Sequence, residues 1–358
     1  MNIDSVSKNN SREGKYALLF GGAGYEREVS VAGAHGFLKT AESIGLEILP
    51  IFIDSGGDFY VFCGKADDVL KINKRASRKI LVPTSPVRIN GESGFYLDGS
   101  IIPIKLVFPL LHGDMGEDGV IQGLLSALNI DFVGADNFTG ALAADKIYSK
   151  IVARSVGVPT LPEIAVSPDT DIGEIVESIE KTFGFPVIVK PARLGSSVGV
   201  SLAKSKQEFS KSLKKAFLCS NRIMVEPALM EKRELECAYY STGKRKIITP
   251  PAEVSFSGEF YDFDLKYKSQ EKVELIPKAD VSGAVVDKIK SYTETLARAM
   301  LARHIARFDY FLAPNGEVYF NEVNTMPGMT PSSLFSKMLL LEGIEYSDFI
   351  LSFKDLDT

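Results

Sequence analysis

The chain has 358 residues, of which 45% are hydrophobic and 24% are charged, and its formal net charge is −5. These values are typical of a soluble globular protein with room for two or three domains, and they give no overall field that would attract nucleic acid or an anionic membrane. Three cysteines without a C-x-x-C spacing argue against a disulfide framework or a structural zinc site, and the absence of both a bilayer-length apolar run and a signal peptide predicts a cytoplasmic location.

The first part of the chain predicts an α/β domain. An apolar run over residues 16–20 enters Gly21-Gly22-Ala23-Gly24, and a helix over 30–43 follows. Strand, glycine turn and helix in succession predict a right-handed βαβ unit and a parallel sheet. Later elements of this part are a strand over 47–53, a strand over 106–111, a helix over 119–128 and a short strand over 130–133. We therefore expect an open, parallel-sheet domain over residues 1–136.

One long stretch of this first domain is hard to interpret. Residues 54–103 are rich in Gly, Ser, Lys and Asp and have no clear apolar period. Asn90-Gly91 within this stretch is a strong signal for a two-residue β-turn. We predict one hairpin there.

The middle of the chain predicts a smaller α+β domain over residues 137–230. A helix over residues 139–156 is ended by Gly157-Val158-Pro159. Apolar periods then predict a helix over 172–183, strands over 186–190 and 198–202, a helix over 206–217 and a strand over 222–226.

The last part, residues 231–358, is rich in strands, with one long helix predicted over 282–302. Apolar residues then alternate over residues 305–312 and again over 318–323, with Pro314-Asn315-Gly316 between them. This pattern predicts a β-hairpin.

Four polar residues of this hairpin form the most informative group in the chain. Side chains alternate along a strand, so Arg307 and Asp309 share one face, as do Glu322 and Asn324. Oxygen ligands without nearby Cys or His suit Mg²⁺, which bridges substrate phosphates, and an arginine beside it can hold negative charge on a transferring group. The alternative is a solvated hairpin with ordinary surface charges.

A second group predicts an anion site. Lys190 ends a predicted strand and is followed by Pro191-Ala192-Arg193 and then Leu194-Gly195-Ser196-Ser197. Small residues let backbone N–H groups approach an anion closely, and the lysine adds a charge. The chain has no G-x-x-x-x-G-K-[ST] phosphate loop. A plain hairpin turn is the alternative, but the preceding strand and lysine favour phosphate binding.

Other candidates are ordinary when taken singly. Lys146 lies in a helical segment, and Glu226 and Glu234 lie in or beside strands, where each could accept one hydrogen bond from a ligand in an apolar slot. His112 and Glu26 follow predicted strands at their carboxyl ends, where open parallel sheets bind ligands. A structural histidine and a carboxylate that caps a helix are the alternatives.

Two further segments complete the candidates. Residues 259–267 are aromatic and charged without a period, so they form either a packed surface loop or an active-site lid. Gly328, Ser333 and Leu334 follow the hairpin and lead into a predicted helix, whose first N–H groups can hold a carboxylate.

Read together, these motifs resemble the D-alanine–D-alanine ligase family of the ATP-grasp superfamily. The resemblance runs over residues 16–353 and rests on the order of the motifs. It implies an N-terminal α/β domain followed by a two-part ATP-grasp fold that grips ATP. It also implies cytoplasmic synthesis of peptidoglycan precursors, ATP and D-alanine as substrates, and a homodimer.

The resemblance assigns roles by matching position. Lys146, Lys190 and the Ser196-Ser197 loop would hold the ATP phosphates, Glu226 and Glu234 the adenosine, and Lys266 the γ-phosphate. Two Mg²⁺ or Mn²⁺ ions would bind Asp309, Glu322 and Asn324. Glu26 would pair with the ammonium of the first D-alanine, His112 would lie near its carboxylate, and Ser196 and Tyr267 would extend a hydrogen-bond chain from Glu26. Arg307 and Gly328 would form an oxyanion hole, and Ser333 and Leu334 would receive the second carboxylate.

Three alternatives stay open at this point. Relatives that join D-alanine to D-serine or D-lactate share this machinery, although the pair Lys266-Tyr267 favours D-alanine. Another carboxylate–amine ligase, similar to glutathione synthetase, is the second. A non-catalytic nucleotide-binding regulator is the third, but the chain keeps every metal ligand and Arg307.

Overall fold

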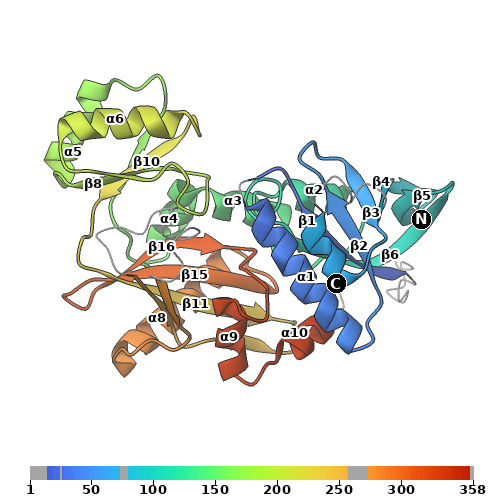
Figure 1. Ribbon diagram of the computed structural model, residues 1–358. Helices are drawn as coiled ribbons and strands as arrows, with labels where there is room; N and C mark the ends of the chain where they lie inside the picture. The colour runs from blue at the N-terminus through green and yellow to red at the C-terminus, as the bar shows by residue number, and fades with distance from the viewer. Residues whose placement is uncertain (1–13, 25, 73–79, 257–272, 355–358) are drawn as a thin grey trace, which may run out of the picture.

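The computed structural model describes residues 14–24, 26–72, 80–256 and 273–354. Its strands form three sheets, which follow one another along the chain. In Figure 1, the N-terminal sheet lies at the right, the small middle sheet at the upper left, and the C-terminal sheet below it.

The N-terminal sheet is closed, and the expectation of an open parallel sheet is wrong. Its six strands follow in sequence order, and the sixth pairs with the first. Only β1 pairs in parallel, with β2 and β6, as a βαβ unit requires; the other neighbours are antiparallel. The strands are β1 (Lys15–Gly21), β2 (Ile48–Ile53), β3 (Phe59–Phe62), β4 (Leu81–Ile89), β5 (Glu92–Leu97) and β6 (Ser100–Leu110).

Strand β6 closes this sheet because it has two partners. Residues 100–103 pair with β5, and residues 104–110 pair with β1. The hairpin predicted at Asn90-Gly91 is confirmed, since these two residues join β4 to β5. Residues 130–133 do not form the predicted strand and make only the single bridge between Val107 and Phe132.

A glycine turn connects β1 to helix α1 (Arg27–Ser43). Gly21 has a φ of +103°, and a Cβ atom there would lie 2.3 Å from the carbonyl oxygen of Ile53, so only glycine fits. The helix begins earlier than predicted and has Glu26 at its N-cap position. The other helical elements that the structure describes before residue 130 are η1 (Ala66–Lys71) and α2 (Val120–Ala127).

The single helix predicted over residues 139–156 is two helices. Helices α3 (Asn137–Ala144) and α4 (Lys146–Ser155) meet at Asp145, which has an extended backbone. Its carboxylate accepts hydrogen bonds from two backbone N–H groups in the first turn of α4. No Gly or Pro marks the break, so helix periodicity runs through it in the sequence. The break places Lys146 at the start of α4.

The middle sheet has the strand order β7, β10, β8, β9 and carries two helices. Its elements are β7 (Ile164–Val166), α5 (Ile172–Thr182), β8 (Val187–Pro191), β9 (Ser201–Ala203), α6 (Lys206–Phe217) and β10 (Ile223–Pro227). Apolar side chains of α5 and α6 share one buried core with the strands. Strand β9 starts later than predicted because Gly199 has a left-handed backbone angle and the N–H of Val200 bonds back to the carbonyl oxygen of Ser197, which makes a turn there.

The C-terminal sheet has the order β14, β13, β11, β15, β16, with β12 paired to β11. Its strands are β11 (Arg233–Ser241), β12 (Lys246–Ile248), β13 (Ala252–Phe256), β14 (Val273–Ile276), β15 (Ile305–Leu312) and β16 (Val318–Asn324). Among its described residues, the helices of this part are α8 (Gly283–Ala299), α9 (Leu334–Leu341) and α10 (Tyr346–Ser352). The predicted hairpin is confirmed as β15 and β16, and helix α4 packs on β16.

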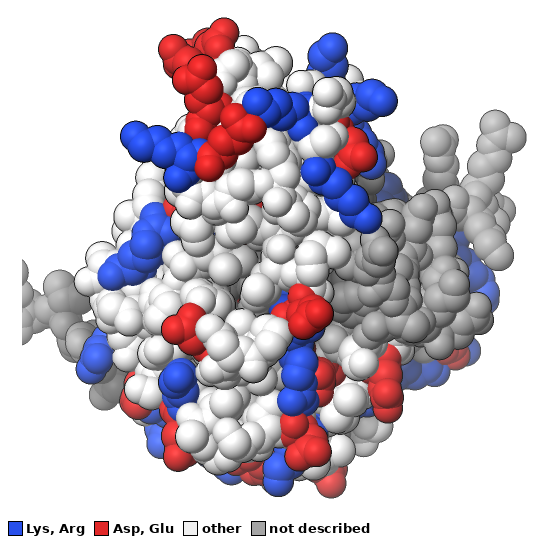
Figure 2. All heavy atoms as spheres, turned by 90° about the vertical axis from the view of Figure 1, so that its left-hand side faces the viewer, with Lys and Arg blue, Asp and Glu red and all other residues white. Residues whose placement is uncertain are grey.

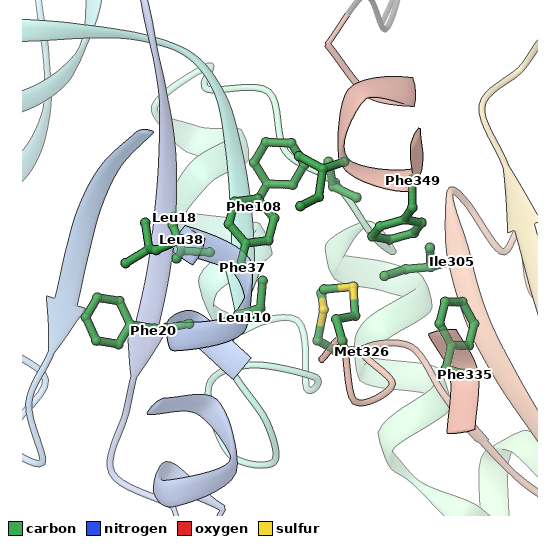
Figure 3. Packing of buried hydrophobic residues seen from close by; sticks show 14 of the residues in the cluster. Leu18, Phe20, Phe37, Leu38, Phe108, Leu110, Ile305, Met326, Phe335 and Phe349 are labelled. Carbon is green, nitrogen blue, oxygen red and sulfur yellow. The ribbon is translucent and has the colours of Figure 1, made fainter. Parts of the chain in front are cut away.

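One apolar core joins the N-terminal and C-terminal parts. Figure 3 shows side chains from β1, α1 and β6 meeting side chains from β15, α9, α10 and the loop after β16. The labelled residues are Leu18, Phe20, Phe37, Leu38, Phe108, Leu110, Ile305, Met326, Phe335 and Phe349. This packing fixes the carboxyl ends of β1 and β6 beside the hairpin of β15 and β16.

His304 adds a polar link between the same two parts. Its Nδ1 accepts a hydrogen bond from the backbone N–H of Gly134 over 3.0 Å, and its ring meets Phe353 edge to face. Burial, with a contribution from Arg303, lowers the pKa of His304 to about 4. The imidazole is therefore neutral at physiological pH.

The surface carries both signs of charge. In Figure 2, Lys and Arg side chains are interspersed with Asp and Glu side chains, and uncharged residues cover the middle of that face. Within the described ranges, no helix has both the length and the apolar character needed to cross a membrane.

Candidate active site

All candidate site residues that the structure describes line one cavity of about 600 Å³. The cavity lies where the three sheets meet, since its wall includes residues from the segments that follow β1 and β6, from β8 and β10, and from β11, β15 and β16. The candidates that line it are Glu26, His112, Lys146, Lys190, Ser196, Ser197, Glu226, Glu234, Arg307, Asp309, Glu322, Asn324, Gly328, Ser333 and Leu334. Lys266 and Tyr267 lie outside the described residues.

The hairpin brings its four polar residues together as predicted. Arg307 pairs with Asn324 across the two strands, and Asp309 pairs with Glu322. Directly opposite residues of an antiparallel pair share a face, so all four side chains point to the cavity. The guanidinium of Arg307 donates two hydrogen bonds to the carboxylate of Asp309, from Nε over 2.7 Å and from Nη2 over 2.6 Å.

A third carboxylate, Glu236, stands beside this pair. It lies opposite Asp309 on the neighbouring strand β11, and its Oε2 is 3.3 Å from Nε of Arg307. Burial raises the pKa of Asp309 to about 7, with the charges of Glu236 and Glu322 acting in the same direction and Arg307 opposing them. Negative charge is therefore crowded at this end of the cavity.

This crowding fits a divalent cation. Asp309, Glu322 and Asn324 supply hard oxygen donors from one face, and a cation among them would relieve the repulsion between the carboxylates. Asp309, Glu322 and Asn324 include only two carboxylates. Across the described residues, no group of three or more His, Cys, Asp or Glu side chains is arranged to hold a metal. A metal at this position would therefore need ligands from substrate or water as well, which is usual for Mg²⁺.

Lys146, at the start of α4, forms an ion pair with Glu322 in the cavity wall. Its Nζ is 3.1 Å from Oε2 of Glu322 and donates a hydrogen bond to the carbonyl oxygen of Leu194 over 2.7 Å. Burial alone would raise the pKa of Glu322, but Lys146 and Lys190 outweigh it and lower the value to about 2. Glu322 is therefore a carboxylate anion at neutral pH.

Lys190 is held by Glu226 at the floor of the cavity. Its Nζ is 2.7 Å from Oε1 of Glu226 and 3.2 Å from Oδ1 of Asn321. The other oxygen of Glu226 accepts a short hydrogen bond from Lys150, which is fully buried. Although burial alone would raise it, the two lysines lower the pKa of Glu226 to about 2.

Glu26 and Ser196 meet across the cavity mouth. The hydroxyl of Ser196 donates a short hydrogen bond to Oε1 of Glu26, and so links the loop of the middle sheet to the N-terminal part. Ser196 and Ser197 both have left-handed backbone angles, with φ of 53° and 57°. Such strain in two successive residues with side chains is typical of functional loops.

His112 is fixed by the chain segment that follows the hairpin. Its Nδ1 lies 3.0 Å from the carbonyl oxygen of Met326. A carbonyl oxygen can only accept, so this nitrogen carries the proton and donates. The carboxylate of Glu117, 3.7 Å from the same nitrogen, accepts a hydrogen bond from the N–H of Gly113. His112 is therefore held in one orientation at the cavity wall.

The segment after β16 supplies the remaining wall. Oδ1 of Asn324 accepts a hydrogen bond from the N–H of Met326, which turns the chain toward α9. The segment leads into helix α9 as predicted, with Ser333 at its N-cap position, and the hydroxyl of Ser333 donates to the carbonyl oxygen of Thr330 over 2.8 Å. The start of a helix therefore faces the cavity beside Gly328 and Leu334.

Glu234 carries an ion pair that the sequence did not predict. Lys232 lies 3.2 Å from it, and its ammonium sits over the ring of Phe311 at 4.8 Å. Burial raises the pKa of Glu234, and Lys232 opposes that shift. Lys232 also lines the cavity.

Comparison with known proteins decides the family. The family model described as D-ala D-ala ligase N-terminus matches residues 15–135, and the model described as D-ala D-ala ligase C-terminus matches residues 152–353. The chain belongs to the D-alanine–D-alanine ligase family. The family member from Lactococcus lactis is 33% identical over 342 residues, which cover 95% of this chain and 94% of that protein. The member from Caldicellulosiruptor bescii is 34% identical over 342 residues, which cover 94% and 93%.

Solved structures of related ligases share the fold. The VanG D-Ala:D-Ser ligase from Enterococcus faecalis superimposes with a TM-score of 0.87 at 28% identity and covers 96% of this chain and 99% of its own. The D-alanine–D-alanine ligase from Coxiella burnetii superimposes with a TM-score of 0.84 at 27% identity, with coverage of 96% and 93%.

Three charged residues of this site were not among the candidates predicted from the sequence: Lys150, Lys232 and Glu236. Lys150 lies four residues after Lys146 on one helix, so the spacing alone places both on one face. Glu236 lies two residues after Glu234 on one strand, which again gives one face. For Lys150 and Glu236, these spacings were the signals in the sequence that each shares a face with a predicted site residue.

Proposed function

We propose that this protein joins two molecules of D-alanine into D-alanyl-D-alanine, with conversion of ATP into ADP and phosphate. The product would serve peptidoglycan precursor synthesis in the cytoplasm. The observation that carries the proposal is the distribution of charge around one cavity. Lys146 pairs with Glu322 there and Lys190 with Glu226, Arg307 pairs with Asp309, and the linked pair of Glu26 and Ser196 lines the same cavity. Membership in the family supports the same activity.

In the first half of the reaction, a carboxylate oxygen of one D-alanine attacks the γ-phosphorus of ATP, the bond to ADP breaks, and an acyl phosphate results. We infer that Lys146 and Lys190 exchange their carboxylate partners for phosphate oxygens, while the loop of Ser196 and Ser197 covers them. Positioning and charge neutralisation are the main contributions in phosphoryl transfer. Glu26 would hold the ammonium of this D-alanine, and His112 would lie near its carboxylate.

In the second half, the amine of the other D-alanine attacks the acyl carbon, and phosphate leaves from the tetrahedral intermediate. The carboxylate of Asp309 accepts hydrogen bonds from Nε and Nη2 of Arg307. The Nη1 group of Arg307, together with the backbone N–H of Gly328, would therefore donate to the oxyanion. Ser333 and Leu334 at the start of α9 would receive the carboxylate of the second D-alanine.

We propose that Asp309, Glu322 and Asn324 hold two Mg²⁺ or Mn²⁺ ions. Bound ions would neutralise phosphate charge and bridge phosphate oxygens. Glu226 and Glu234 would contact the adenosine, with Leu161, Ile188 and Leu229 among the apolar residues around them. We also propose domains over residues 1–136, 137–230 and 231–358, and a homodimer, which light scattering would test.

D-Serine is a second candidate for the second substrate. The similarity to the VanG D-Ala:D-Ser ligase at a TM-score of 0.87 favours it. D-Alanine is preferred here because the curated relatives are D-alanine–D-alanine ligases.

The test is phosphate release in the presence of ATP and Mg²⁺. We expect release with D-alanine as the only amino acid, and formation of the dipeptide in equal amount. Release only when D-serine or D-lactate accompanies D-alanine would instead support the other ligases. No release with any of the three would contradict the proposed function.

A further inference from the structure

Lys150 is a fully buried lysine just behind the cavity. It lies on α4, one turn after Lys146, and its side chain has no exposure to solvent. A buried ammonium is costly unless it is paired, and burial lowers the pKa of Lys150 against the opposing effect of Glu226. No step of the proposed reaction uses this residue, so its presence needs another reason.

The contacts of Lys150 lead to the cavity through one carboxylate. Its ammonium donates to Oε2 of Glu226, whose Oε1 is 2.7 Å from Nζ of Lys190. Lys190 and Glu226 line the cavity. The carboxylate of Glu226 therefore lies between two ammonium groups, one at the cavity wall and one buried behind it.

With both lysines protonated and Glu226 ionised, the charges of these three groups sum to +1. With Glu226 and Lys190 alone, the sum would be zero, and the floor of the cavity would offer a phosphate a neutral ion pair. A second lysine behind the carboxylate neutralises Glu226 and leaves the charge of Lys190 uncompensated. At low effective dielectric, one unit charge at this depth changes the attraction for a phosphate appreciably.

We propose that Lys150 is a positioning residue for nucleotide binding: it neutralises and orients Glu226, so that Lys190 presents its full charge to the ATP phosphates. This inference rests on the proposed function, which assigns Lys190 to those phosphates. It is distinct from a purely structural role in anchoring α4. Arg154, four residues further along α4, supplies such an anchor through two hydrogen bonds to Glu163 of 2.7 Å and 2.6 Å.

The experiment compares two ligands on the 358-residue protein, a nonhydrolysable ATP analogue and adenosine, by calorimetry. For Lys150→Met we expect a loss of analogue affinity of about tenfold or more and a clearly smaller loss of adenosine affinity, because both ligands would contact Glu226 but only the analogue carries phosphates. For the matched control Arg154→Met we expect a lower melting temperature and unchanged affinity for both ligands.

A compensating variant sharpens the test. Lys150→Met combined with Glu226→Gln removes both charges behind Lys190, so it should bind the analogue more tightly than Lys150→Met alone. If Lys150→Met fails to fold, the double variant is compared with Glu226→Gln, and the inference predicts analogue affinities within about threefold. Without the carboxylate, burial favours the neutral amine of Lys150, so neither of these two variants carries a charge behind Lys190.

Several outcomes would overturn the inference. Unchanged analogue affinity in Lys150→Met would do so, as would equal losses for analogue and adenosine, or a double variant that binds no better than the single one. A wild-type protein that binds no ATP analogue would instead contradict the proposed function. The two failures are therefore distinguishable.

Discussion

Replacement of Glu322 by Gln tests the predicted metal site with the smallest change in shape. The pKa of Glu322 is about 2, so the substitution removes a full negative charge at neutral pH while the side chain keeps its length. Lys146 keeps its hydrogen bond to the carbonyl oxygen of Leu194, which limits the disturbance of α4.

The expected effect follows from the loss of one charged ligand to a phosphate-bridging metal. Such a contact is worth several kcal/mol in the transition state, and about 3 kcal/mol corresponds to about a 10²-fold lower turnover at about 1.4 kcal/mol per decade. The Mg²⁺ concentration for half-maximal activity should rise as well.

Phosphate release at varied Mg²⁺ concentration measures both effects. Glu253→Gln is the matched control, because Glu253 forms a two-bond ion pair with Arg233 on the same sheet and does not line the cavity. Turnover of Glu322→Gln within threefold of the wild-type value, or an equal loss in Glu253→Gln, would refute the assignment of Glu322 as a metal ligand.

Three further predictions concern other parts of the structure. Arg307→Lys loses the two-bond geometry of guanidinium to carboxylate and should lower turnover about 10²-fold in the phosphate-release assay; a change below threefold would argue against an oxyanion role. The pKa of His304 is about 4 in the folded protein, below its ordinary value of 6.5, so its contribution to stability is complete above pH 6.5 and is lost as the pH falls toward 4. Urea unfolding at pH 7 and pH 4.5 should show a loss of about 2 to 3 kcal/mol that His304→Asn reduces, and equal losses in both proteins would contradict this. Gly21→Ala should cost more than about 3 kcal/mol of unfolding free energy, and Gly45→Ala only about 1 kcal/mol, because a Cβ at Gly21 meets backbone whereas Gly45 has open space at a φ of +68°; similar losses would be the contrary result.

The sequence predicted the local features of the site well. The hairpin of β15 and β16 carries alternating apolar residues that bury one face, so its polar residues had to share the other. Helix α6 matches its predicted bounds because a Ser N-cap and an apolar period agree. In each case the decisive contacts are between near neighbours in the chain.

Features that depend on distant contacts were not predictable in the same way. Closure of the N-terminal sheet depends on β6 having two partners, which no local pattern reveals. The break between α3 and α4 depends on Asp145, whose carboxylate also binds Arg193, just after β8, and Arg222, just before β10. The partner of Lys150 comes from a strand 76 residues away, so the helix spacing indicates a face but not a function.

The most direct test of the central claim follows one oxygen atom. D-Alanine labelled with ¹⁸O in its carboxylate is supplied with ATP and Mg²⁺, and the released phosphate is analysed by mass spectrometry. If the carboxylate attacks the γ-phosphorus and the acyl phosphate is then broken by the amine, each phosphate carries one labelled oxygen. Release of unlabelled phosphate together with the dipeptide would contradict the account.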